Sequence, residues 1–89
     1  MTRGARQKPE RLAEKLLQIR LALGLSQNEM IRRLDAELTQ NRISEYELGK
    51  GEPSLIILLR YARVAGVHME DIVDDEVDLP EKLPSRRRR

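Results

Sequence analysis

The hydrophobic positions of this sequence recur at the spacing of α-helices. Four of them are separated by four, three and four residues, which places them on one face of a helix: Leu12, Leu16, Ile19 and Leu23. Pro9 suits the first position of that helix, and Gly24 suits its end. The sequence therefore predicts a first helix from Pro9 to Leu23.

Capping residues divide the following part of the chain into short helices. Ser26 and Glu29 have the spacing of a capping box, in which each side chain binds a free amide at the helix start. Thr39 and Ser54 are suitable caps for two further helices. Glycine or proline follows most of these segments and ends them. The predicted helices cover residues 27–34, 40–48, 55–65 and 69–73.

The segment QNRISEYEL, residues 40–48, is too polar to be stabilised by burial alone. Ile43 and Tyr46 are its inward pair, at the i, i+3 spacing of neighbours on a helix face. The side chains on the outward side are then those of Gln40, Asn41, Ser44 and Glu45. This pattern indicates a helix that is anchored on the core and offers polar groups to a partner.

Composition narrows the class of protein. The chain has 89 residues, enough for one domain with an aliphatic core, since it contains two Tyr, no Phe and no Trp. It has no Cys, which excludes disulfides and cysteine-based metal sites, and no apolar run of the roughly 20 residues that a membrane helix needs. We expect a soluble cytoplasmic protein without a membrane partner.

No set of residues suited to catalysis is present. With one histidine, His68, and no Cys, no Ser/His/Asp or Cys/His set can be assembled. The position of His68 after a helix-ending glycine suits a cap or the surface. The carboxylates of residues 70–78 do not have the spacing of an EF-hand loop. We expect no enzyme activity, no cofactor and no metal site.

Charge is unevenly distributed along the chain. Residues 1–69 have a balance of +4, residues 70–81 of −7 and residues 82–89 of +5. A mildly basic body fits a nucleic-acid partner. Dense charge and two prolines predict that residues 74–89 form a flexible, disordered tail, and residues 1–7 are predicted to be a mobile N-terminus.

Three segments, in this order and at these separations, resemble the lambda-repressor-like (XRE-type) helix-turn-helix family. They are LALGLSQNEM, TQNRISEYELGKGEPSL and LLRYARVAGVHMEDIV, and the resemblance covers residues 9–73. It implies a compact all-α fold of five helices, with a DNA-binding domain at residues 8–73 and a recognition helix at 40–48 that enters the major groove.

The resemblance also implies roles for individual residues. Base contacts fall on Gln40, Asn41 and Glu45, and a phosphate contact falls on Gln27 at the start of the second helix. By charge alone Arg42 and Lys50 are candidates for phosphate contacts, and Ser44 contacts either a phosphate or nothing. The alternative for each is an ordinary solvated side chain. Glu45 needs a donor, because a carboxylate near phosphates is otherwise repelled.

In the family, the positions of Arg20 and Glu47 often form a partly buried ion pair that braces the recognition helix. We interpret both as structural. Two features depart from the family pattern: the turn after Leu34 is about two residues longer and lacks a glycine, and Ile31 occupies a position that is usually Ala. These departures leave the angle of the recognition helix open.

The leading hypothesis is a sequence-specific transcriptional regulator, a homodimer on a two-fold DNA site. The alternative is a protein-interaction module of the same fold, such as an antitoxin that binds a toxin or a bridge to the transcription machinery. Residues 86–89, all Arg, would either add phosphate contacts or remain solvated, and the acidic stretch 70–78 is a candidate internal competitor for DNA. The operator, the regulated genes, the sign of regulation, the dimer surface and any effector are not specified by these residues.

Overall fold

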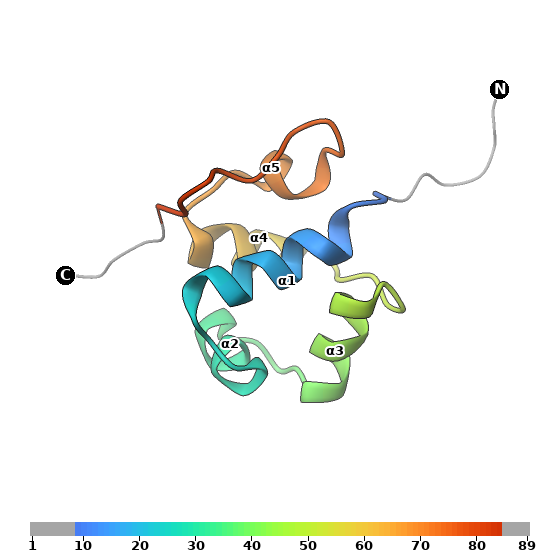
Figure 1. Ribbon diagram of the computed structural model, residues 1–89. Helices are drawn as coiled ribbons and strands as arrows, with labels where there is room; N and C mark the ends of the chain where they lie inside the picture. The colour runs from blue at the N-terminus through green and yellow to red at the C-terminus, as the bar shows by residue number, and fades with distance from the viewer. Residues whose placement is uncertain (1–8, 85–89) are drawn as a thin grey trace, which may run out of the picture.

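The computed structural model describes residues 9–84, and within that range the chain forms five α-helices and no strand (Figure 1). They are α1 Leu12–Leu23, α2 Gln27–Leu34, α3 Gln40–Leu48, α4 Leu55–Ala65 and α5 Met69–Val73. The predicted all-α fold of five helices is confirmed. The predicted mobile N-terminus, residues 1–7, and the basic residues 86–89 lie outside the described residues.

The predicted caps are present at the starts of α2, α3 and α4. Ser26 Oγ accepts from the Glu29 amide at 3.1 Å, while Glu29 Oε1 accepts from the Ser26 amide at 2.8 Å, which is the complete capping box. The hydrogen bond from the Ser26 amide favours the carboxylate and is the main cause that lowers the pKa of Glu29, and the Ser26 side chain adds to it. Thr39 Oγ1 accepts from the Arg42 amide, and Ser54 Oγ from the Ile57 amide. These side chains fix where the helices begin.

The prediction that Pro9 opens the first helix is wrong, because α1 begins at Leu12. The amides of Glu10 and Arg11 each donate to the carboxylate of Asp75 at 2.9 Å. These bonds lower the pKa of Asp75. A side chain more than 60 residues away thus supplies the polar contacts that a local cap would otherwise provide, and nothing near Pro9 in the sequence indicates it.

The turn between α2 and α3 is closed by a non-glycine residue. Asp35 has φ 52° and ψ 50°, a left-handed conformation that Asp tolerates better than most residues. Its amide donates to the carbonyls of Ile31 and Arg32, and Arg60 from α4 donates to the carbonyls of Leu34 and Asp35. The longer turn is therefore held to α4, and Ile31 is half-buried at the edge of the core.

Helix α1 runs through the middle of the molecule, with α2 and α3 on one side and α5 on the other (Figure 1). Twelve hydrophobic side chains from the five helices form the core: Leu12, Leu16, Ile19, Met30, Leu34, Ile43, Tyr46, Leu58, Tyr61, Ala62, Ala65 and Ile72. Burial of this aliphatic surface is the main stabilising term. It also places α3 against α1 and α2, with its other side outward.

The chain stays attached to the body beyond α5. Lys15 of α1 has no exposed surface, and its ammonium donates to the carbonyls of Asp71, Asp74 and Val77 at 3.0, 2.8 and 2.5 Å. Arg11 forms an ion pair with Asp78 at 2.8 Å, and Leu79 and Leu83 pack against the core. Contacts with the body thus continue past residue 73, the predicted domain boundary, because Lys15 in α1 supplies a donor for the carbonyls and Arg11, just before α1, supplies one for Asp78.

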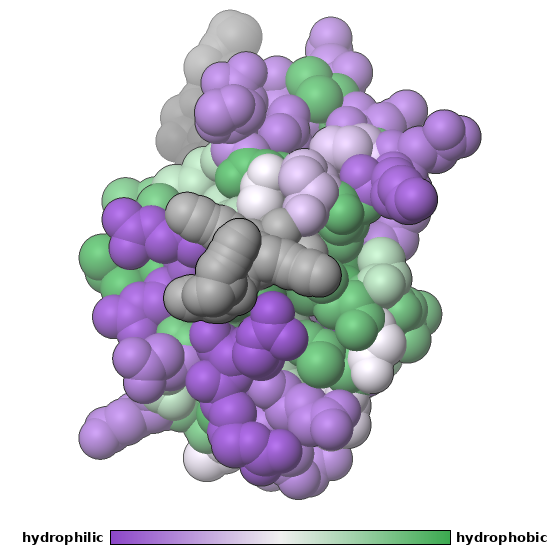
Figure 2. Space-filling view, turned by 90° about the vertical axis from the view of Figure 1, so that its left-hand side faces the viewer, coloured by the Kyte–Doolittle hydropathy of each residue, from purple (hydrophilic) through white to green (hydrophobic). Residues whose placement is uncertain are grey.

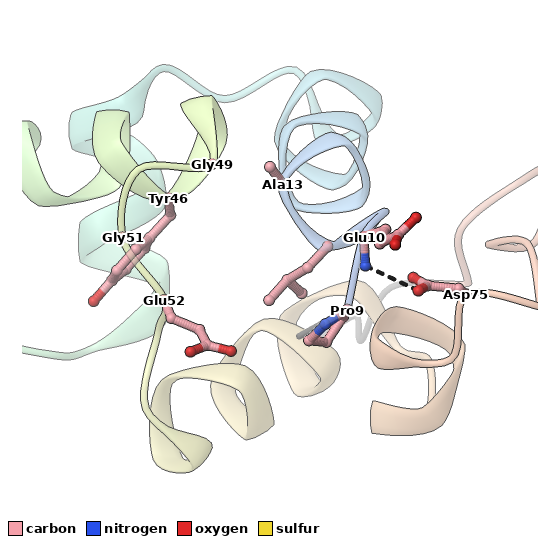
Figure 3. A pocket seen from close by; sticks show the side chains of 9 residues that line it. Pro9, Glu10, Ala13, Tyr46, Gly49, Gly51, Glu52 and Asp75 are labelled. Carbon is pink, nitrogen blue, oxygen red and sulfur yellow. Dashed lines mark hydrogen bonds between the residues drawn. The ribbon is translucent and has the colours of Figure 1, made fainter. Parts of the chain in front are cut away.

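The surface has a hollow and a set of exposed hydrophobic side chains. A hollow of about 540 Å³ lies between the start of α1 and the end of α3, with Leu12, Ala13 and Tyr46 among its walls and the Glu10–Asp75 contact at one side (Figure 3). Seen from another side, the surface is largely hydrophilic, with hydrophobic side chains between the hydrophilic regions on both sides of the view (Figure 2). The large hydrophobic residues most exposed among those described are Leu21, Leu48, Leu55 and Ile56.

Candidate nucleic-acid interface

Helix α3 has one side that packs on the core and another that is polar and faces outward. Ile43 is fully buried and Tyr46 is 6% exposed, so these two residues hold the helix to the core. Gln40, Asn41 and Arg42 are exposed on its first turn, and Ser44 and Glu45 are half-buried. The start of α3 thus offers two amides and a guanidinium to an approaching partner.

Arg20 of α1 and Glu47 of α3 form an ion pair. Arg20 Nε and Nη2 donate to the two oxygens of the Glu47 carboxylate at 2.7 and 2.9 Å, and Nη1 donates to the Leu25 carbonyl at 3.0 Å. The two side chains are only 15% and 6% exposed. The hydrogen bonds to Glu47 raise the pKa of Arg20. This bidentate geometry fixes the end of α3 to α1.

Two glutamines extend this pair to the surface. Gln27, the first residue of α2, donates from Nε2 to Glu47 Oε1 at 3.1 Å. Gln40, the first residue of α3, donates from Nε2 to Gln27 Oε1 at 3.2 Å. A continuous chain of hydrogen bonds therefore runs from Arg20 through Glu47 and Gln27 to Gln40, and it links three helices. We call these four residues the polar relay.

The remaining candidate residues lie outside the polar relay. Arg42 forms an ion pair with Glu45 at 3.2 Å, which supplies the donor that this carboxylate needs. Lys50 is exposed beyond the end of α3, and its amide donates to the Glu45 carbonyl at 2.8 Å. Among the described residues, the Asn41 side chain has no hydrogen-bond partner. Charge and amide groups thus extend along α3 and into the loop after it.

The contacts between Gln27, Glu47 and Gln40 are not predicted by the sequence. The sequence predicts a phosphate contact for Gln27, a base contact for Gln40 and an ion pair for Glu47, as separate roles. The signal in the sequence was the position of the two glutamines, each first in its helix after a capping residue. That position brings the side chains together only when α2 and α3 cross near their starts, which is a property of the tertiary structure.

Tyr61 lies beneath the polar relay. It has no exposed surface, and its hydroxyl has no hydrogen-bond partner within residues 9–84. Burial is the main cause that raises its pKa, and the charge of Glu47 adds to it. A buried hydroxyl without a partner is costly. Sequence reasoning did not find this residue.

Two other kinds of feature are absent from the described part of the chain. No group of three or more His, Cys, Asp or Glu side chains in that part could hold a metal ion. No helix found there has the length and apolar character to cross a membrane. The polar side of α3 and the start of α2 are therefore the features that most need a functional explanation.

Comparison with known proteins identifies one family. The sequence model of that family, described as helix-turn-helix, matches residues 16–72, which include most of α1 and nearly all of α5. A search of curated proteins and a search of solved structures found no match. The family is one of DNA-binding regulators, which typically have no enzymatic activity. The chain belongs to the helix-turn-helix family of the lambda-repressor-like (XRE) type.

Proposed function

We propose that this protein is a sequence-specific regulator of transcription that binds double-stranded DNA, with α3 in the major groove. The observation that supports this most directly is the exposed polar start of α3 on a helix anchored by Ile43 and Tyr46. An α-helix fits the major groove, where each base pair presents a distinct set of donors and acceptors. Gln40, Asn41 and Glu45 are the proposed base contacts.

Phosphate contacts would hold the protein in register. The start of α2 carries the free amides and the partial positive charge that bind anions, and Gln27 is located there. The other proposed contacts with the DNA phosphates come from Arg42, Ser44 and Lys50. The ion pair of Arg42 with Glu45 reduces the repulsion between that carboxylate and the phosphates.

We propose further that the protein acts in the cytoplasm as a homodimeric repressor. A closed dimer has a two-fold axis, and two recognition helices would then contact half-sites one helical turn of DNA apart, about 34 Å. Repression would follow from occupation of an operator. Each of these properties extends the family's role as DNA-binding regulators.

Selection from a random duplex library at about 150 mM salt tests the proposal. The parent should enrich a palindromic motif, and a Gln40→Ala/Asn41→Ala variant should lose it while keeping weak, salt-dependent binding. Gln18→Ala, an exposed change on α1, is the matched control and should enrich the parent's motif. If the parent enriches no motif, contact with bases is refuted.

A second candidate function is that of a protein-interaction module, such as an antitoxin or a bridge to the transcription machinery. The exposure of Leu55 and Ile56, 72% and 57%, favours a protein contact at the start of α4. In this case Gln40→Ala/Asn41→Ala would leave partner binding unchanged, whereas Leu55→Ser/Ile56→Ser would abolish it. Pull-down with a toxin encoded beside the gene would distinguish the two functions.

A further inference from the structure

We propose that Arg60 of α4 is a positioning residue for the contact with DNA. It holds the end of α2 and, through the turn that follows, sets the angle at which the start of α3 meets the bases. This role rests on the proposed function, since it concerns how α3 is presented to DNA. In it Arg60 contacts neither a base nor a phosphate.

The turn between α2 and α3, residues 35–39, has few hydrogen bonds of its own. The Asp35 amide donates to two carbonyls near the end of α2, both at 3.2 Å. The amides of residues 36–38 donate to no described residue. Ala36 and Leu38 pack against the core, but apolar contact has no preferred direction. The turn by itself therefore fixes the direction of α3 only weakly.

Arg60 supplies the directional contact that the turn lacks. Its Nη1 donates to the carbonyl of Leu34, the last residue of α2, at 3.1 Å, and also to the carbonyl of Asp35. These carbonyls belong to the two peptide planes on either side of the Asp35 Cα atom. A donor that binds both planes holds the backbone angles of Asp35, φ 52° and ψ 50°, at the point where the chain leaves α2.

Helix α4 gives this contact a firm support. Leu58, Tyr61 and Ala62, which surround Arg60 in the helix, are buried in the core. Arg60 itself is half-buried. The turn is thus fixed relative to the core of the molecule, in addition to its attachment to the neighbouring helices.

The two ends of α3 are held by different contacts. The ion pair of Arg20 with Glu47 fixes the end of the helix, and the turn leads into its start. Nine residues make α3 about 13 Å long. A tilt of about 10° at the ion pair would move the first residue by about 2 Å, enough to break a hydrogen bond to a base. The bond between Gln27 and Gln40 joins long side chains that can follow such a tilt. Base contact therefore depends on Arg60.

Arg63 offers a matched control on the same helix. It lies about one turn after Arg60, is exposed, and donates to no described residue. Arg63→Met and Arg60→Met remove the same charge, so any general loss of attraction to DNA is common to both variants. The difference between them then reports the contact of Arg60 with the turn.

The experiment measures the affinity of each variant for the selected DNA site and for a random duplex, over a range of salt concentrations. We expect Arg60→Met to lower the ratio of the two affinities about tenfold, with the salt dependence of Arg63→Met. Arg63→Met should keep the parent's ratio, and Arg60→Lys, which keeps a donor, should recover most of it. Circular dichroism checks folding. If Arg60→Met does not fold, Arg60→Gln replaces it, because its shorter amide cannot reach both carbonyls.

Two results of this measurement would overturn the inference. A weaker salt dependence for Arg60→Met than for Arg63→Met, with the parent's ratio of affinities, would make Arg60 a phosphate contact. A folded Arg60→Met variant with lower stability but the parent's ratio and salt dependence would make its role merely structural.

Amide hydrogen exchange tests the positioning without DNA. In Arg60→Met the bonded amides of Asp35 and Arg42, on either side of the turn, should exchange faster relative to the Gly49 amide at the other end of α3. Arg63→Met should leave this comparison unchanged. If the parent selects no DNA motif, the proposed function fails, and the exchange result still decides whether Arg60 holds the turn. Unchanged exchange in Arg60→Met would overturn the inference whatever the DNA result.

Discussion

Helix α1 carries two buried or nearly buried cations, and they hold different parts of the chain in different ways. Arg20 binds the carboxylate of Glu47 in α3, side chain to side chain. Lys15, five residues earlier, binds three main-chain carbonyls in the segment from Asp71 to Val77. The first contact braces the candidate DNA-contacting helix, and the second holds the acidic segment after α5.

The ion pair of Arg20 and the carbonyl contacts of Lys15 differ in which residue types they need. An ion pair needs two particular side chains, so both Arg20 and Glu47 can be identified from a family pattern. A carbonyl belongs to every residue, so the sequence around Val77 carries no sign that it will bind Lys15. Contacts to the main chain depend on the path of the chain and leave little trace in residue types.

The two contacts should also differ in energy. Loss of one partner of the ion pair leaves a buried charge uncompensated. Loss of Lys15 leaves neutral carbonyls, which cost less to leave without a partner and can turn toward water. The following four predictions test this comparison, starting with the largest expected effect.

Arg20→Met should lower the free energy of unfolding by about 3–5 kcal/mol, because Glu47 would remain as a buried, unpaired charge. Urea unfolding followed by circular dichroism measures it. Adding Glu47→Leu should restore most of the loss. An Arg20→Met variant that unfolds at the parent's urea concentration would show that the pair does not brace α3.

Lys15→Met should lower the free energy of unfolding by about 2 kcal/mol, since three carbonyls lose their donor while the aliphatic stem is replaced. Amide hydrogen exchange in residues 71–77 should become faster than in the rest of the core. Lys50→Met, at an exposed position, serves as the control and should change stability by less than about 0.5 kcal/mol. A loss as large as that of Arg20→Met would remove the distinction between the two contacts.

Tyr61→Phe should leave the protein equally stable or raise the free energy of unfolding by about 1 kcal/mol. The Tyr61 hydroxyl is buried without a partner among the described residues, so its removal takes away a desolvation cost. The melting temperature measures the change, with Tyr46→Phe as a comparison in which 6% of the residue is exposed. Marked destabilisation by Tyr61→Phe would mean that the hydroxyl supports the nearby charges of Arg20 and Glu47.

Asp75→Asn should give the smallest effect, and it should depend on pH. The folded state lowers the pKa of Asp75, so this carboxylate stabilises the fold above its unfolded pKa, about 3.9, and the contribution is lost as pH falls through the lower folded value. At pH 7 the variant should melt below the parent, and the difference should shrink below about pH 4. Glu76→Gln, at an exposed neighbour, is the control. A difference that stays constant with pH would assign the effect to something other than this charge.

Local signals in the sequence determined much of the fold. Ser26, Thr39 and Ser54 begin three helices, and the Gly24, Gly49 and Gly66 positions end three. Cap geometry involves only a few consecutive residues, so a short stretch of sequence is sufficient to predict it. The hydrophobic spacing of α1 and the Ile43–Tyr46 pair likewise placed the core faces correctly.

Tertiary structure decided the contacts between residues far apart in the chain. The Asp75 carboxylate accepts hydrogen bonds from the amides just before α1, and Lys15 binds carbonyls in α5 and in the segment after it. Gln27 forms hydrogen bonds with both Glu47 and Gln40. Each contact depends on how helices cross, and crossing angles follow from packing of the whole core rather than from any local pattern. The sequence by itself determined which residues stand at the start of α3 and why they are polar. Only the assembled fold decided which atoms of Gln40 remain free, because hydrogen bonds from another helix occupy the rest.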